Sequence, residues 1–222
     1  QRSMREQFTS VKSVLTDTFE RIEKLHQGDG GLRGIPTGYF DLDNLLSGLQ
    51  KSDLVIIAAR PSVGKTTFAL DIVRHLAVKE KKSVGMFSLE MPKEQLVDRL
   101  LCAQAGVDLW RMRTGKLSQS SEHDDFPRIG HAMGELSESK IFIDDTASVN
   151  VMEIRTKARR LHQEHGLDCL VVDYLQLMEG RNRSGDNRVQ EVAEISRSLK
   201  AIARELDVPV VALSQLSRAV EV

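Results

Sequence analysis

The 222-residue chain has few cysteines and no long apolar run. Its two cysteines, Cys102 and Cys169, are too few for a disulfide framework and favour a reducing compartment. No stretch reaches the roughly 18 apolar residues that a membrane-spanning helix requires, and the first residues lack the apolar segment of a signal peptide. The sequence therefore predicts a cytoplasmic protein that makes no membrane contact.

The chain also has almost no net charge, because 31 Lys and Arg residues are set against 32 Asp and Glu residues, which leaves −1. This balance excludes a protein that coats nucleic acid through bulk electrostatics. Any nucleic-acid contact has to come from a few local basic groups. With 41% hydrophobic and 28% charged residues, the composition is that of a globular domain with enough chain for a sizeable core.

Near the start of the chain, residues 8–26 carry apolar side chains three and four positions apart, which predicts an amphipathic helix. Its stripe consists of Phe8, Val11, Leu15, Phe19 and Ile22. The turn-rich segment 26–31 predicts a hinge, so we assign residues 1–30 to a linker helix and hinge and residues 31–222 to one domain. The pattern alone leaves open whether the stripe packs on its own domain or on another copy.

Beyond the hinge, short apolar runs alternate with longer amphipathic segments. The runs lie at 54–59, 84–88, 141–143, 169–172 and 210–213, and the helical segments near 66–79, 93–105, 151–165 and 188–207. Continuous apolar runs suit strands that are buried on both faces. Asn150, with Glu153 three positions later, predicts a capping box at the start of the third helix. The alternation indicates a doubly wound α/β domain.

The strongest motif follows the first apolar run and predicts a phosphate-binding loop. Small residues let backbone N–H groups surround a phosphate, a lysine reaches the β- and γ-phosphates, and a hydroxyl holds Mg²⁺. Gly64, Lys65 and Thr66 fit these roles, and the next helix directs its positive end at the anion. The first glycine of the motif is replaced by Ala59, which fits if its φ is negative. We expect nucleotide contacts from Ser62, Val63, Gly64, Lys65, Thr66 and Thr67.

Three further side chains end apolar runs and are candidates for the same site. Asp173 should lie at the end of a strand neighbouring the first, where it can hold Mg²⁺ directly or through water. Glu90 can orient or deprotonate a water molecule, although it could instead cap the helix that Pro92 opens. The amide of Gln215 can hydrogen-bond a γ-phosphate and report its loss.

Five segments in this order resemble the DnaB-type replicative helicases. They are residues 38–43, 59–66, 88–91, 172–176 and 212–216. The resemblance implies a RecA-like P-loop NTPase domain, with a mostly parallel central sheet and helices on both faces, preceded by a linker helix. It also implies a homo-hexameric ring that hydrolyses ATP with Mg²⁺ between subunits, translocates on single-stranded DNA and unwinds duplex at the replication fork. Primase and a helicase loader are the implied partners.

The same resemblance assigns roles to individual residues. Lys65 and Thr66 bind the phosphates and Mg²⁺, with Asp173 as the second acid at the metal. Glu90 becomes the catalytic base and Gln215 the γ-phosphate sensor. Arg99 becomes an arginine that reaches the nucleotide, although it could instead be a solvated charge on a helix. The apolar stripe docks on an adjacent subunit through Val11, Leu15, Phe19 and Ile22.

The family continues past this sequence with a DNA-contacting loop and a basic hairpin that carries an arginine finger, and it has an additional N-terminal domain. Because the chain begins without Met and stops just after the last run, we expect a domain that is incomplete at its C-terminal end. We place DNA contacts in a basic loop at Arg181, Arg183 and Arg188, with an ordinary surface loop as the alternative. Trp110 is expected in core or interface packing. The rival function is a RecA-like recombinase or a nucleotide-gated assembly ATPase that does not unwind DNA.

Overall fold

The computed structural model describes residues 9–27, 32–120, 123–175, 178 and 188–216. They fall into two compact units, residues 1–33 and 34–222, and each unit is described by itself. Most of the predicted hinge, residues 28–31, lies outside the described residues. Among the described helices, none has both the length and the apolar character needed to cross a membrane.

The first unit contains one helix, α1 (Val11–Gln27). The predicted amphipathic helix is therefore present, although Phe8 lies outside the described residues. The apolar stripe is exposed, with values that run from 56% at Ile22 to 74% at Val11. Among the described residues of this unit, no second element covers the stripe, and a helix of about this length is marginally stable alone in water.

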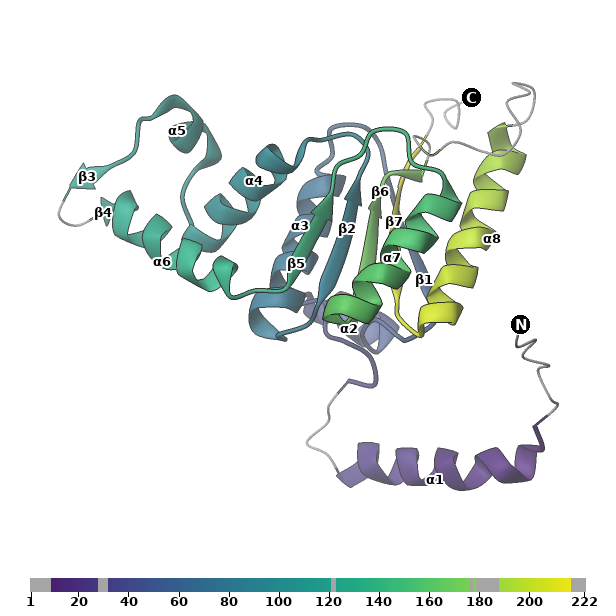
Figure 1. Ribbon diagram of the computed structural model, residues 1–222. Helices are drawn as coiled ribbons and strands as arrows, with labels where there is room; N and C mark the ends of the chain where they lie inside the picture. The colour runs from purple at the N-terminus through teal and green to yellow at the C-terminus, as the bar shows by residue number, and fades with distance from the viewer. Residues whose placement is uncertain (1–8, 28–31, 121–122, 176–177, 179–187, 217–222) are drawn as a thin grey trace. The chain divides into compact units, whose positions relative to one another are not determined.

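The second unit is built on a five-stranded parallel sheet (Figure 1). Its strands are β1 (Leu54–Ala59), β2 (Val84–Ser88), β5 (Ile141–Asp144), β6 (Cys169–Asp173) and β7 (Val210–Gln215). Their order across the sheet is β1-β7-β6-β2-β5, and each neighbouring pair is parallel. All five strands therefore end at the same edge of the sheet, where the candidate side chains are expected.

Helices cover both faces of this sheet, so the predicted α/β architecture is confirmed (Figure 1). One face is covered by α3 (Lys65–Arg74), the π-helical turn η1 (His75–Lys79) and α4 (Lys93–Ala105), the other by α7 (Val151–His165) and α8 (Arg188–Leu206). Successive residues of β6 alternate between the two cores: Val171 packs with α3 and α4, and Val172 with α7 and α8. The capping box predicted at Asn150 and Glu153 is present.

Several elements were not predicted. They are α2 (Phe40–Leu46), α5 (Leu109–Thr114), the hairpin β3 (Gln119–Ser120) and β4 (His123–Asp124), and α6 (Asp125–Ser137). A small third core of Ala105, Val107 and Ala132 joins α4 to α6. Of the two alternatives for Trp110, core packing is wrong, because its side chain is 59% exposed and Lys116 lies 4.9 Å from its ring centroid. Interface packing stays a prediction.

Candidate nucleotide-binding site

The loop between β1 and α3 has the backbone of an anion-binding turn. Gly64 is the N-cap of α3 at φ 96° and ψ 19°, a conformation that favours glycine. A Cβ built at Gly64 meets nothing within 4 Å, so the backbone angle and not crowding accounts for the glycine. Ser62 also has a positive φ, 63°. Turns of this kind direct successive N–H groups into one concavity, which suits a phosphate group.

Ala59, which replaces the first glycine of the motif, lies in β1 opposite Gln215. It is not among the residues with positive φ, so an alanine fits this position without strain. Its carbonyl oxygen accepts a 3.1 Å hydrogen bond from the amide of Leu216. The departure from the motif therefore leaves the start of the loop intact.

Thr66 and Asp173 meet across the edge of the sheet, where the hydroxyl of Thr66 donates a 2.7 Å hydrogen bond to Oδ2 of Asp173. Asp173 has no exposed surface. Burial raises the pKa of this carboxyl, the Thr66 hydrogen bond and the positive charge of Lys65 lower it, and the negative charge of Glu90 raises it further. The pKa remains above its ordinary value. Four predicted site residues thus lie within electrostatic reach of one another.

The Thr66 and Asp173 pair also fits a divalent cation. Among the described residues, Oδ1 of Asp173 is buried and accepts no hydrogen bond. A buried carboxylate oxygen without a donor is costly, and a bound cation would compensate for it. Hydroxyl and carboxylate oxygens are the ligand type that Mg²⁺ prefers.

The strand order corrects one prediction, since β6 is not the neighbour of β1. Strand β7 lies between them, paired with β1 through Ala59 and Gln215 and with β6 through Val172 and Ala212. Gln215 therefore ends the strand that separates the phosphate loop from Asp173. The sequence predicted a common edge and could not predict this order, because apolar runs carry no information on which strands pair.

Glu90 lies after β2, in the short turn before α4, and its side chain is exposed. The alternative in which Glu90 caps α4 is wrong. The N-cap residue is Pro92, and the first helical amide, that of Lys93, donates a 3.0 Å hydrogen bond to Oδ2 of Asp145. Glu90 is thereby left available for another role at the edge of the sheet.

Two contacts link the loop to side chains around it. The ammonium group of Lys65 lies 4.5 Å from the centroid of the Tyr174 ring, a cation–π contact that the sequence did not lead us to predict. The aromatic residue directly after Asp173 was the available signal. Arg99, which is half-buried, directs Nη1 to Oγ1 of Thr67 at 3.4 Å. This places Arg99 beside α3 and disfavours the solvated-charge alternative.

The basic loop cannot be placed in the same way. Arg181 and Arg183 lie outside the described residues. Arg188 is the first residue of α8, but its side chain is not described either.

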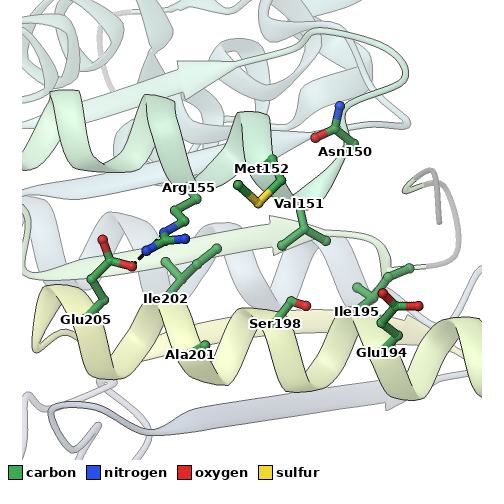
Figure 2. Close-up of a pocket in the computed structure, with 10 residues that line it drawn as sticks. All are labelled: Asn150, Val151, Met152, Arg155, Glu194, Ile195, Ser198, Ala201, Ile202 and Glu205. Carbon is green, nitrogen blue, oxygen red and sulfur yellow. Dashed lines mark hydrogen bonds and ion pairs between the residues drawn. The ribbon is translucent and has the colours of Figure 1, made fainter. Parts of the chain in front are cut away.

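A separate groove of about 400 Å³ lies between α7 and α8 (Figure 2). Arg155 of α7 and Glu205 of α8 form an ion pair at 2.7 Å at one end, and Met152 and Ile195 line the other part. None of the predicted site residues lines it. The groove is therefore distinct from the site at the strand ends.

A parallel sheet with a glycine-capped loop after β1, and a buried acid that meets the first turn of the next helix, defines a P-loop nucleotide-binding domain. Within that class, residues 34–222 match the family described as the DnaB-like helicase C terminal domain. The chain belongs to this family, and its fold is RecA-like.

Curated relatives agree with the family match. The chain is 55% identical over 214 residues to the replicative DNA helicase DnaB of Geobacillus stearothermophilus, with 96% of this chain and 46% of the relative covered. It is 54% identical over 221 residues to the replicative DNA helicase DnaC of Bacillus subtilis, with 100% and 48% covered. The chain thus spans about half the length of these relatives.

Solved structures give the same result. One of them, described as an ATPase domain, superimposes with a TM-score of 0.86 at 37% identity, covering 97% of this chain and 74% of that one. A DnaB-like replicative helicase, described together with its interactions with primase, gives a TM-score of 0.84 at 37% identity, covering 96% and 51%.

Proposed function

We propose that the chain is the ATP-hydrolysing motor domain of a replicative DNA helicase. The proposed protein is a homo-hexameric ring that hydrolyses ATP at its subunit interfaces, translocates on single-stranded DNA and unwinds duplex at the replication fork. The observation that carries this proposal is the contact between Thr66 and Asp173, with Lys65 and Glu90 beside it. The names of the bacterial relatives support the same activity and a cytoplasmic location.

The phosphate loop binds the triphosphate of ATP in this proposal. The backbone amides around Ser62, Val63 and Gly64 surround the phosphates, and Lys65 leaves the ring of Tyr174 to reach them. Thr66 and Asp173 hold Mg²⁺, which, when bound, neutralises charge on the phosphate oxygens. Thr67 and Arg99 add a hydroxyl and a positive charge on the α4 side of the loop.

Glu90 serves as the catalytic base. Its exposed carboxylate lies at the same sheet edge as Asp173 and accepts the proton of the water that attacks the γ-phosphate. Gln215 ends β7, between the strands that carry the loop and the acid, and its amide senses the γ-phosphate. A displacement of Gln215 reaches both neighbouring strands because β7 is hydrogen-bonded to each.

The remaining roles concern assembly and partners. The exposed stripe of Val11, Leu15, Phe19 and Ile22 docks on another copy of the chain, since an uncovered apolar helix face of this size calls for a partner. Arg181, Arg183 and Arg188 contact the phosphates of single-stranded DNA. Primase and a helicase loader are the protein partners, and the relative described with primase supports the first of these.

Two substitutions in the full-length protein test the catalytic assignment. Lys65→Ala should abolish ATP binding, measured with a fluorescent ATP analogue. Glu90→Ala should keep that binding and reduce hydrolysis by at least about 100-fold. Unimpaired turnover in Glu90→Ala would remove Glu90 from the catalytic role.

A forked duplex separates helicase from recombinase. ATP-dependent strand separation by the full-length hexamer supports the helicase. Filament formation on single-stranded DNA without strand separation supports a recombinase or an assembly ATPase instead.

A further inference from the structure

Glu90 lies in a four-residue turn, Ser88 to Met91, that is fixed from two sides. On one side, the amide of Leu89 donates a 2.7 Å hydrogen bond to the carbonyl oxygen of Asp173. On the other, the hydroxyl of Ser88 donates a 2.7 Å hydrogen bond to the carbonyl oxygen of Met91 and accepts one of 3.3 Å from its amide. The exposed carboxylate of Glu90 therefore projects from a backbone that is clamped before and after it.

Among the described residues, Ser88 is the only residue of this turn whose side chain bridges the two ends of the turn by hydrogen bonds. It is the last residue of β2, pairs with Asp173 in the sheet and is 1% exposed. Its hydroxyl makes both bonds to a single residue, Met91, so the bonds define the shape of the turn. An alanine would leave two backbone groups of Met91 without this partner.

We infer that Ser88 is a positioning residue for hydrolysis: its hydroxyl holds the Ser88–Met91 turn in the shape that aims the Glu90 carboxylate at the attacking water. This inference rests on the proposed function, in which Glu90 is the base. A base has to lie within hydrogen-bond reach of the proton that it accepts, and a displacement of about 1 Å can lower the rate by about 100-fold. Ser88 is almost fully buried and its hydroxyl bonds to Met91, so it acts through Glu90.

The chain offers a matched control at the other end of the same strand. Ser83 precedes β2, is 3% exposed, and its hydroxyl donates a 2.7 Å hydrogen bond to the carbonyl oxygen of Gly166. Ser83→Ala therefore removes the same atom, with one hydrogen bond where Ser88→Ala removes two, at the edge of the sheet away from the site. Ser88→Thr is the conservative variant that keeps the hydroxyl.

The experiment measures kcat and KM for ATP in the full-length protein. Ser88→Ala should lower kcat by about 10- to 100-fold and change KM by less than about twofold, because Lys65, Thr66 and Asp173 are untouched. Ser83→Ala should keep kcat within about twofold, although it should also lower the melting temperature. Ser88→Thr should recover most of kcat. Equal kcat values in Ser88→Ala and Ser83→Ala, or a rise in KM that matches the loss of kcat, would overturn the inference.

A double variant separates positioning of Glu90 from general weakening of the fold. In a Glu90→Gln background, adding Ser88→Ala should change the residual turnover by less than about twofold, since the group it positions is already gone. A further large loss would overturn the inference. If Ser88→Ala does not fold, Ser88→Cys keeps the side-chain volume with weaker hydrogen bonds and should give an intermediate kcat; a kcat equal to that of the unsubstituted protein counts against it.

Failure of the inference and failure of the proposed function give different results. Wild-type turnover in Glu90→Gln removes the base and the inference together. A strongly impaired Glu90→Gln with a fully active Ser88→Ala rejects the positioning role alone.

Discussion

Thr66 and Asp173 lie 107 positions apart in the chain, yet the hydroxyl of the first is 2.7 Å from the carboxylate of the second. The contact joins the first turn of α3 to the end of β6, although β7 lies between β6 and β1, the strand that precedes α3. It brings the two oxygen donors of the proposed Mg²⁺ site together before any ligand is considered.

This contact predicts a specific difference between two substitutions of Thr66. Thr66→Ala removes the hydroxyl and should lower kcat/KM for Mg²⁺-dependent ATP hydrolysis by about 100-fold or more. Thr66→Ser keeps the hydroxyl and should stay within about tenfold of the unsubstituted protein. Steady-state ATPase assays over a range of Mg²⁺ concentrations provide the measurement, and equal activities of the two variants would contradict the assignment.

The buried carboxylate of Asp173 should reduce stability while serving function. Because burial raises its pKa and Oδ1 has no hydrogen-bond donor among the described residues, the folded protein disfavours the charged form. Asp173→Asn keeps an oxygen for Thr66 and removes the charge, so it should raise the free energy of unfolding by about 1 kcal/mol at neutral pH while ending hydrolysis. Urea denaturation followed by circular dichroism measures the first effect, and a lower stability in the variant would refute the explanation.

A second carboxylate, Asp71, should contribute stability with the opposite dependence on pH. Its Oδ2 accepts a 2.7 Å hydrogen bond from the hydroxyl of Tyr39, and Arg74 pairs with Oδ1. Burial pushes the pKa of Asp71 up, but the hydrogen bonds from Arg74 and Tyr39 outweigh it and hold this pKa below its ordinary value. The stabilisation is therefore complete above the unfolded-state pKa and is lost as the pH falls through the lower folded-state pKa.

The matching variant is Asp71→Asn, which should lower the free energy of unfolding by about 1 kcal/mol at pH 7. The difference from the unsubstituted protein should shrink below about pH 4, as the carboxyl of the latter becomes protonated. Denaturant titrations at several pH values test this, because the other carboxyls titrate equally in both proteins and cancel. A difference that stays constant down to about pH 2.5 would show that Asp71 does not act through its charge.

Replacing either of two exposed glycines in α6 with alanine should stabilise the folded protein. A Cβ at Gly130 or Gly134 meets nothing within 4 Å, and neither residue has a positive φ. Gly130→Ala and Gly134→Ala should each raise the free energy of unfolding by about 0.5–1 kcal/mol, because alanine loses less backbone entropy in a helix.

Gly106 provides the contrasting control. Its φ is +63° and a Cβ there would lie 2.6 Å from the guanidinium of Arg128, so Gly106→Ala should destabilise the protein. Thermal unfolding of the three variants gives the comparison. A destabilised Gly130→Ala would contradict the argument from open space.

The sequence predicted the parts of this fold whose signals are local. The apolar run at 169–172 and the amphipathic segment at 151–165 both became the expected elements, and the capping box at Asn150 formed because its residues are close together in the chain. The phosphate loop was equally predictable, since Gly64 and Lys65 follow a strand directly. The helices in residues 106–140 were missed although local signals were present: apolar side chains recur at Phe126, Ile129, Met133 and Leu136, and Asp108 and Asp124 are the N-caps of α5 and α6.

The site was only partly predictable for a different reason. The type of each group followed from its place after an apolar run, as for Glu90 and Asp173. The spatial order of the strands did not, because it depends on pairing between segments that are distant in the chain. The cation–π contact of Lys65 with Tyr174 depends on that order too, so it emerged only from the three-dimensional structure. The hydrogen bonds of Ser88 with Met91 are local, but their geometry also became visible only there.

The position of β1 has a consequence for how this domain is synthesised. Within the described residues, β1 pairs with β7 alone. Leu54 therefore has no neighbouring strand until Val210 has been synthesised. A ribosome that makes the chain from its N-terminus therefore releases the phosphate loop long before the strand that holds it in place. Parallel pairing over such a distance is slow, because loop-closure entropy is lost before the contacts form. Nucleotide-binding competence is thus expected to appear only after β7 has been inserted beside β1.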